Sequence, residues 1–225
     1  MIIETLKKSK IFSALPEEDL RKIAPLFEIR DYKHNDYIFL ESDPTDWFYI
    51  SSKGRVKIVK HSLAGKDVIL EIKMPGEIFC CSAVMNKRPY PESALAMEDA
   101  SVIRISRVDL FTLIEKYPLL QFEFAKYNSD RLEDAQDMMI NIASEKAEKR
   151  IATVLLRLAE KAGIEDAGYR KIDLPLTRQE IADMVGTTVE TCIRAISKLQ
   201  KKGMVKTQGR RILVKTSDLE KFIAL

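Results

Sequence analysis

The stretch Leu176-Thr-Arg-Gln-Glu-Ile-Ala-Asp-Met-Val-Gly186, followed closely by Val189-Glu-Thr-Cys-Ile-Arg194, decides the fold of the C-terminal third of this 225-residue chain. Thr177, with a glutamate three residues later, is typical of a capping box, in which both side chains satisfy backbone N–H groups at a helix start. We expect a short helix over 178–185. Gly186 is predicted to close that helix, because glycine readily adopts the left-handed conformation of a helix end.

A second helix is predicted over 188–201, opened by another capping box at Thr187-Thr-Val-Glu190. Two short helices joined by a turn that contains glycine form a helix-turn-helix. Residues 203–214 then read as strand, turn and strand, which is the wing of a winged helix. A third capping box, Ser217-Asp-Leu-Glu220, is predicted to open a last helix.

The second helix is expected to place its N-terminal turn in the major groove of DNA. Arg194 can bond a guanine with two hydrogen bonds, Glu190 can accept from a cytosine amine, and Val189 can contact a thymine methyl. The alternative role for the Glu190 carboxylate is the capping box. The candidate base-reading residues are Val189, Glu190, Ile193 and Arg194. The candidate phosphate contacts, which position the protein without reading sequence, are Thr177, Arg178, Thr188, Thr191, Lys198, Arg210 and Arg211.

The charge of the chain is divided unevenly along its length. The formal net charge is only +3, but residues 145–225 hold 17 basic and 11 acidic residues, and residues 1–144 carry the balance of −3. Residues 191–215 contain eight basic residues and no acidic one. This asymmetry suggests an anionic partner, with double-stranded DNA first, and charge alone leaves a solvated basic face as an equal alternative.

Composition excludes several classes of protein. With 46% hydrophobic and 32% charged residues, the sequence is neither disordered nor a disulfide-stapled mini-protein. It contains no apolar run of about 18 residues, and its N-terminus lacks the apolar core of a signal peptide. Three cysteines, two of them adjacent, fit a reducing cytoplasm, so we expect a cytoplasmic protein without a membrane partner. The sequence has two histidines and carries no P-loop, G-x-S-x-G or H-E-x-x-H motif, so we do not expect an enzyme.

The N-terminal half reads as short helices over 4–26 and then as short strands over 28–105. Residues 55–60 alternate charged and apolar side chains, which is the pattern of a half-buried strand. Several such runs, separated by turn residues, indicate an antiparallel barrel, roll or sandwich.

The sequence becomes helical after Asp109 and remains so to about residue 162. One apolar stripe at heptad-like spacing runs through an otherwise polar segment, and it consists of Ala125, Asn128, Leu132, Ala135, Met139 and Ile142. So narrow a stripe favours the seam of a coiled-coil homodimer. The alternative is a stripe that packs on the chain's own β domain. We expect three parts: an effector-sensing domain over 1–117, a dimerisation helix over 118–146, and a winged helix-turn-helix over 147–225.

At the 176–194 stretch the chain resembles the Crp/Fnr superfamily of bacterial transcription regulators. The segment Phe48-Tyr-Ile-Ser-Ser-Lys-Gly54-Arg-Val-Lys-Ile58 also resembles the β-roll of that family. The resemblance implies an α+β fold with an N-terminal antiparallel β-roll, a homodimer, and RNA polymerase as a partner. Val189-Glu190 with Arg194 resembles the oxygen-sensing Fnr branch and implies a palindrome with TTGAT-like half-sites. Ile193 departs from the small polar residue of that branch.

The resemblance also bears on the effector. The cAMP pocket of the family has Gly-Glu, matched here by Gly76-Glu77, and then Arg-Ser, whose place is taken by Glu92-Ser93. A carboxylate in the place of the phosphate-binding arginine is repulsive, so cAMP and cGMP are not expected. An Fnr-type iron–sulfur cluster needs about four cysteine thiolates, and three cysteines argue against it.

The adjacent cysteines Cys80 and Cys81 have three readings. In the first reading they are small buried thiols without a function, as free cysteine often is. In the second they form a haem site that senses CO or NO, and in the third they are a thiol redox switch. Cys80 matches the cysteine haem ligand of the carbon-monoxide-sensing members, but Ser82 replaces the nearby histidine. Another small effector, such as an organic acid, is left open. As an alternative for the whole chain, a cyclic-nucleotide-binding module of a signalling protein is weakened by Glu92 and by the helix-turn-helix.

Overall fold

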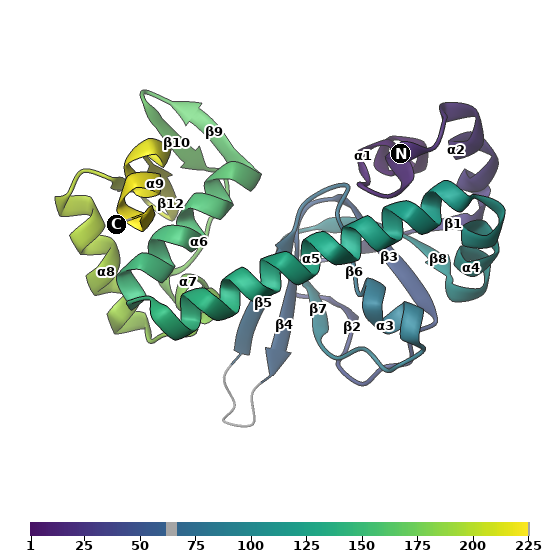
Figure 1. Cartoon of the computed structure of the whole chain (residues 1–225), viewed down its shortest axis with the longest axis horizontal. Coiled ribbons are helices and arrows are strands. Elements are labelled where there is room, and N and C mark those ends of the chain that lie inside the picture. Colours follow the sequence, from purple (N-terminus) through teal and green to yellow (C-terminus); the bar gives the residue numbers. More distant parts are fainter. Residues whose placement is uncertain (62–66, 225) are drawn as a thin grey trace. The chain divides into compact units, whose positions relative to one another are not determined.

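The computed structural model describes residues 1–61 and 67–224, apart from the side chains of Asp67, Ile142 and Ser144, and divides into two compact units, Met1–Ala135 and Gln136–Leu225 (Figure 1). The N-terminal unit contains α1 (Ile2–Lys8), η1 (Phe12–Ala14), α2 (Glu17–Ile23), η2 (Ala24–Leu26), β1 (Phe27–Tyr32), β2 (Tyr37–Phe39), β3 (Trp47–Lys53), β4 (Val56–His61), β5 (Asp67–Lys73), β6 (Ile78–Phe79), α3 (Cys81–Asn86), β7 (Ser93–Ala96), β8 (Ala100–Ser106), α4 (Arg107–Lys116) and most of α5 (Pro118–Ser144).

Two four-stranded antiparallel sheets form the body of this unit. One has the strand order β1-β8-β3-β6 and the other the order β2-β7-β4-β5. Strand β4 alternates as its sequence predicts: Val56 and Ile58 are buried, while Lys57 between them is only half-buried. The mixed α+β fold with an N-terminal antiparallel roll is therefore confirmed.

Aromatic and branched side chains fill the space inside the roll. Phe39 stacks on Tyr90 with ring centroids 4.0 Å apart, and Tyr49 stacks on Phe79 at 5.4 Å. All four residues are at least 95% buried. Large aromatic rings provide much of the apolar area that this core removes from water.

Close backbone approaches explain two glycines of the roll. A Cβ on Gly54 would lie 2.7 Å from the carbonyl oxygen of Asp99, and one on Gly76 would lie 2.7 Å from the Cβ of Lys8. Both glycines also have positive φ, at +69° and +94°. Any side chain at either position would strain the turn.

Helix α5 begins in the N-terminal unit and ends in the C-terminal one. Leu120 and Phe124, near its start, are buried in the core of the roll. The three-part division with a separate dimerisation helix over 118–146 stays a proposal, because the compact units divide after Ala135, inside this helix.

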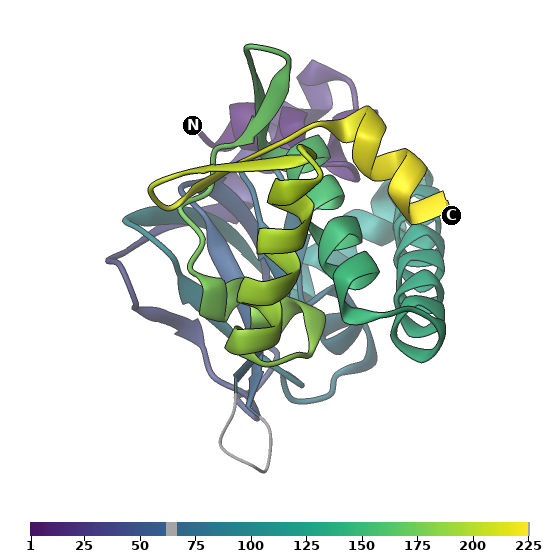
Figure 2. The same cartoon turned by 90° about the vertical axis from the view of Figure 1, so that its left-hand side faces the viewer.

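The C-terminal unit holds the end of α5, then α6 (Ala147–Ala162), β9 (Gly163–Asp166), β10 (Tyr169–Ile172), α7 (Arg178–Val185), α8 (Val189–Lys201), β11 (Val205–Gln208), β12 (Arg211–Val214) and α9 (Thr216–Ala224). Its antiparallel sheet has the order β11-β12-β10-β9. Figure 2 shows the β11–β12 hairpin, the wing, extending beside one end of α8. In the described part of the chain, no helix combines the length and apolar character that crossing a membrane requires.

The hairpin β9–β10 is absent from the sequence prediction. It follows α6 directly, and its two-residue turn of Ala167 and Gly168 has φ of +48° and +76°. Positive φ at both turn residues is typical of the tight hairpin turn that matches strand twist. The third capping box is also wrong, because α9 begins at Thr216, and Ser217 therefore lies inside the helix rather than before it.

Candidate nucleic-acid interface

The first helix of the motif, α7, begins and ends as predicted. The Thr177 hydroxyl accepts a hydrogen bond from the Glu180 backbone N–H at 3.1 Å, and the Glu180 carboxylate accepts one from the Thr177 N–H at 2.9 Å. Gly186 ends the helix in the left-handed conformation, with φ of 68°. This capping box and this glycine turn are therefore confirmed.

The second helix, α8, begins one residue later than predicted. Its N-cap is Thr188, whose hydroxyl accepts a hydrogen bond from the Thr191 N–H at 3.2 Å. Thr187 belongs to the end of α7 instead, because its N–H donates to the Ala182 carbonyl at 3.0 Å. The capping box over 187–190 is therefore wrong, because Thr188 is the N-cap and its hydroxyl bonds to Thr191 rather than to Glu190.

The buried and exposed faces of α8 separate clearly. Cys192, Ala195, Ile196 and Leu199 are buried in the core of the unit. The opposite face is exposed and consists of Glu190, Ile193, Arg194, Ser197, Lys198 and Lys201. Three of the four predicted base-reading residues thus share one exposed surface, and Val189 lies half-buried at its edge.

Arg194 and Ile193 give this surface its character. Arg194 is exposed, and its guanidinium lies 3.4 Å from the Thr191 hydroxyl, a contact that uses one of its five N–H donors. The Ile193 side chain is 47% exposed beside it. A large apolar group on a helix rich in basic residues suits contact with the apolar edge of a base better than contact with water.

Lys198 of α8 and Lys202, the residue that follows this helix, share one carboxylate of α6. The Glu148 carboxylate lies 3.5 Å from the Lys198 ammonium and 3.0 Å from that of Lys202. Burial opposes ionisation of Glu148, but the two lysines together hold its pKa below the ordinary value. Lys202 has the same carboxylate partner as Lys198, although sequence reasoning did not select it. A phosphate that approaches Lys198 must compete with Glu148.

The wing places its cations differently from the sequence prediction. Arg210 is exposed in the turn, whereas the Arg211 guanidinium pairs with the Asp173 carboxylate at 2.6 Å. The ammonium of Lys206 lies 4.2 Å from the ring centre of Tyr169, a cation–π contact.

Arg178 and Thr177 lie at the start of α7, and Arg178 is half-buried there.

Two of the residues that match the family's nucleotide pocket accept hydrogen bonds from backbone N–H groups of the roll. The Glu77 carboxylate accepts from the Met74 N–H at 2.6 Å, which closes the turn that contains Gly76. The Ser93 hydroxyl accepts from the Glu41 N–H at 2.9 Å. These bonds hold turns and strand ends of the roll in place.

A buried ionic cluster lies close to these residues, and the sequence did not reveal it. The Lys73 side chain is 4% exposed, and its ammonium lies 2.8 Å from the Glu71 carboxylate. Glu71 also pairs with Arg131 of α5. Burial lowers the pKa of Lys73, and Glu71 opposes this effect. A lysine at the end of a strand gives no sign in the sequence that it is buried.

Cys80 and Cys81 lie where β6 passes into α3. Burial is the main cause that raises the pKa of Cys80 well above its ordinary value, and the Glu92 carboxylate raises it further. Burial likewise raises the pKa of Cys81 to about 11. A redox thiol needs the opposite shift. Both histidines, His34 and His61, are exposed. The burial of both thiols therefore favours the reading as small buried thiols over that of a redox switch.

The predicted stripe of α5 lies on the exposed side of that helix. Leu132 and Met139 are 60% and 62% exposed, and Ala125, Asn128 and Ala135 are exposed as well. The Ile142 side chain lies outside the described residues. Within the N-terminal unit, the exposure of Ala125, Leu132 and Ala135 favours the dimer seam over packing on the β-roll of the same chain.

Two family models match the chain. The Crp-like helix-turn-helix domain matches residues 149–224, and the cyclic nucleotide-binding domain matches residues 29–117. Together these matches cover the wing, both helices of the motif and most of the β-roll.

Relatives of known identity are similar over most of their length. The chain is 24% identical to the CRP-like cAMP-activated global transcriptional regulator of Mycobacterium tuberculosis H37Rv, over 96% of each chain. It is 28% identical to the transcriptional activator protein Anr of Pseudomonas aeruginosa, over 81% of this chain and 75% of that one. The solved structure of FixK2 from Bradyrhizobium japonicum superposes with a TM-score of 0.76 at 25% identity, covering 87% of this chain and 96% of the other.

Proposed function

The chain belongs to the Crp/Fnr superfamily of DNA-binding transcription regulators, and from this premise we propose that it is a homodimer that binds a palindromic site with TTGAT-like half-sites. The observation that carries the proposal is the exposed face of α8, where Glu190, Ile193 and Arg194 lie together. This face lies at the start of the second helix of the motif, and the major groove of DNA is wide enough to admit one α-helix.

Each residue of this face has a separate role in the proposal. Arg194 bonds a guanine, Glu190 accepts from a cytosine amine, and Val189 contacts a thymine methyl at the edge of the face. Ile193 contacts the middle of the half-site. The exposure of Glu190 in the first turn of α8, on the same side as Ile193 and Arg194, supports its base contact.

Phosphate contacts come from both helices and the wing. In the proposal, the starts of α7 and α8 and the wing turn hold the DNA backbone, and Lys202 joins them because it shares Glu148 with Lys198. The proposed phosphate contacts are Thr177, Arg178, Thr188, Thr191, Lys198, Lys202, Arg210 and Arg211.

The exposed stripe of α5 supplies the dimer seam. Burying Leu132, Met139 and their neighbours against a second copy would remove from water an apolar strip that one chain leaves open. A dimer then presents two recognition helices to half-sites about one helical turn apart. RNA polymerase is the proposed further protein partner, and the cytoplasm the proposed compartment.

The effector is proposed to bind the β-roll and to differ from cAMP. Burial raises the pKa of Glu92, and the positive charges of Lys60 and Arg131 oppose that effect. A carboxylate in these surroundings stands where the family's cAMP pocket has a phosphate-binding arginine. The bonds of Glu77 and Ser93 within the roll support the same conclusion. The proposed effector is a small molecule other than a cyclic nucleotide, and haem at Cys80 is one candidate.

A binding experiment tests the proposal directly. Fluorescence anisotropy compares a palindromic duplex with two TTGAT-like half-sites and a scrambled duplex of equal composition, at several salt concentrations. We expect the palindrome to bind at least about a thousandfold more tightly, with affinity falling steeply as salt rises. Equal binding of both duplexes, or binding without a salt slope, would refute the proposed function. Titration with cAMP should leave both affinities unchanged.

A further inference from the structure

The ring of Tyr169 holds the cations of two neighbouring segments of the wing. The ammonium of Lys206, on β11, lies 4.2 Å from the ring centre, and that of Lys215, just after β12, lies 5.3 Å from it. Strand β12 lies between β11 and β10, the strand that carries Tyr169. A cation over an aromatic ring is attracted to the negative face of the ring. The wing is therefore tied to β10 through these side chains.

Tyr169 is itself fixed in place. The residue is only 9% exposed, and its hydroxyl donates a hydrogen bond to the Gly203 carbonyl at 3.1 Å. Gly203 lies three residues before Lys206, in the segment that joins α8 to β11. One side chain thus holds both the segment that leads into β11 and the ammonium of its lysine.

The two lysines differ in their other partners. Lys215 has the Asp218 carboxylate 3.9 Å away. The ammonium of Lys206 is exposed and, within the described part of the chain, has neither an ion pair nor a hydrogen bond. An ammonium has three N–H donors, and contact with a ring face joins none of them to an acceptor. Lys206 is therefore held in place and can still donate to an anion.

Other cations of the DNA-binding unit have a carboxylate close by. Arg211 pairs with Asp173, and Lys198 and Lys202 share Glu148. A phosphate that approaches any of these cations competes with an acid, whereas a phosphate that approaches Lys206 does not.

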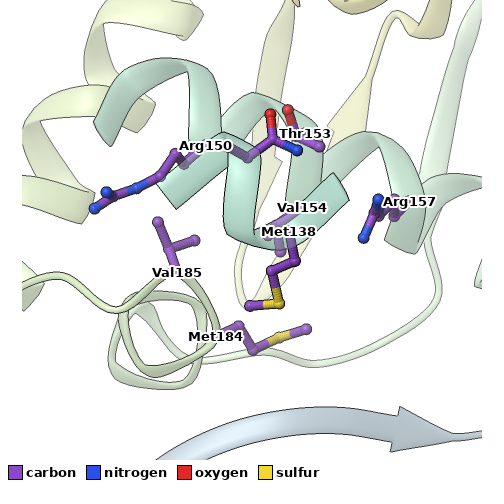
Figure 3. A pocket seen from close by; sticks show the side chains of 8 residues that line it. Met138, Arg150, Thr153, Val154, Arg157, Met184 and Val185 are labelled. Carbon is purple, nitrogen blue, oxygen red and sulfur yellow. The ribbon is translucent and has the colours of Figure 1, made fainter. Parts of the chain in front are cut away.

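The arginines of α6 lie at a pocket instead of the wing. Figure 3 shows Arg150 and Arg157 at opposite sides of a small apolar space that includes Met138 and Met184 in its lining. Arg157 has the Asp137 carboxylate 4.0 Å away. These arginines therefore add nothing to the cations that the wing presents.

Strand β11 leads from Lys206 to the tip of the wing. Lys206 and Gln208 lie two residues apart and so on one face of the strand, and exposed Arg210 follows in the turn. Four residues of extended chain span at most about 13 Å. The charges of one DNA strand follow each other about every 3.4 Å along the helix axis, so Lys206 and Arg210 can reach different phosphates of one strand.

We propose that Lys206 is a further phosphate contact of the wing and that Tyr169 is the residue that positions it. The inference rests on the proposed function, because it needs DNA beside the wing. The ring keeps a long side chain ordered before DNA binds, so less side-chain freedom is lost in the complex. Tyr169 itself touches no DNA in this arrangement.

Proton NMR of the full chain tests the positioning without DNA. Ring currents move protons above an aromatic face upfield, so the ε-methylene signal of Lys206 should lie upfield of that of Lys221, an exposed lysine of α9. Lys206→Met identifies the signal by removing it. Tyr169→Phe should retain the upfield shift, and Tyr169→Leu should abolish it.

Anisotropy titrations across salt concentrations separate the charge from its position. Lys206→Met keeps an unbranched stem opposite buried Leu213 and should flatten the slope of log K against log salt by about one, on palindromic and scrambled duplexes alike. Tyr169→Leu keeps both lysine charges, so it should leave the slope unchanged and weaken binding about two- to fivefold. In the Lys206→Met background, Tyr169→Leu should weaken binding no further. Lys221→Met is the matched control and should alter neither quantity.

Three results would overturn the proposal: an unaltered slope in Lys206→Met, an ε-methylene signal without an upfield shift, or equal weakening by Tyr169→Leu in both backgrounds. The spectrum of the unaltered chain and Lys206→Met decide the question even if Tyr169→Leu fails to fold. Equal binding of the palindromic and scrambled duplexes would refute the proposed reading of sequence, and the comparison of slopes would still decide the phosphate contact of Lys206.

Discussion

The Thr188 hydroxyl lies 3.2 Å from the Thr191 backbone nitrogen and accepts its hydrogen bond. This bond marks Val189 as the first residue of α8. The buried side chains Cys192, Ala195, Ile196 and Leu199 fix the rotation of the helix, so Glu190, Ile193 and Arg194 lie on its exposed side. The capping box predicted from the sequence would have made Thr187 the N-cap instead.

Replacing the cap tests this start of the helix. Thr188→Ala should lower the free energy of unfolding by about 1 kcal/mol, because a backbone N–H then loses its partner. Thr187→Ala is the matched control, since only the backbone N–H of Thr187 takes part in a bond to Ala182. Urea unfolding of both variants gives the comparison. Equal losses in the two variants would contradict the assignment of the N-cap to Thr188.

Arg194→Ala tests the reading of DNA sequence. The variant should lose about 1–3 kcal/mol of binding free energy on the palindrome and accept any base at one position of the half-site. Lys201→Ala, on the same exposed face but at the far end of α8, should keep the base preference. Selection of binding sites from a randomised duplex measures both effects. If Arg194→Ala retains the full preference, the proposed base contact is wrong.

Glu148→Gln should strengthen DNA binding rather than weaken it. The carboxylate lies within 3.5 Å of both the Lys198 and the Lys202 ammonium groups, so removing its charge releases two cations for phosphate contact. We expect affinity to rise for palindromic and scrambled duplexes alike, with a steeper salt slope.

Two further variants test the proposed phosphate contact of Lys198. Lys198→Ala alone should flatten the slope of log K against log salt by about one. Glu145→Gln, which removes a carboxylate paired with Lys149, is the control and should change neither quantity. Anisotropy titrations across salt concentrations measure all three variants. An unaltered salt slope in Lys198→Ala would refute its phosphate contact.

Much of the DNA-binding unit could be predicted because its signals are local. Helix α7 begins and ends where Thr177 and Gly186 predict, since a capping box and a left-handed glycine need only their own neighbours. The start of α8 required knowledge of one tertiary detail, the bond that Thr187 makes back to Ala182. Nothing in the local sequence separates two adjacent threonines as N-caps.

Other features could not be predicted because contacts distant in sequence create them. Lys73 is the last residue of its strand, and only the folded roll encloses it with Glu71 and Arg131. The hairpin β9–β10 follows a helix without a gap, so its Ala167-Gly168 turn is the only local sign of it. The pairing of Lys198 with Glu148 spans two helices and has no signature in the sequence.

Leu132→Glu tests the dimer seam. The side chain is 60% exposed on one chain, so the variant should fold normally, yet like charges would face each other across a two-fold seam. Sedimentation equilibrium should show a dimer for the unaltered protein and a monomer for the variant at micromolar concentration. Lys126→Glu adds a carboxylate to an exposed position of α5 outside the stripe and should remain dimeric. A dimeric Leu132→Glu variant would place the seam elsewhere.

The buried thiols predict how stability depends on pH. Burial raises the pKa of Cys81 and of Cys192 from 9.0 to about 11 in the folded chain. In the unfolded chain both thiols titrate near their ordinary value, about 8.5. Between these values the unfolded form loses protons that the folded form keeps, so stability falls as pH rises from about 9 to 11. Below that window the contribution is fully present.

Cysteine variants separate the contribution of the thiols to this pH dependence from any contribution of the lysine side chains. Cys81→Ala and Cys192→Ala should each flatten the fall in unfolding free energy between about pH 9 and pH 11, because each removes one thiol that the folded chain keeps protonated. Ser82→Ala, an exposed position of the same helix as Cys81, should leave the slope unchanged. Urea unfolding in a reducing buffer at several pH values measures the slopes. If all three variants lose stability with pH as steeply as the unaltered chain, the thiols are not held in their neutral form, and the argument against a thiolate at this end of the roll fails with it.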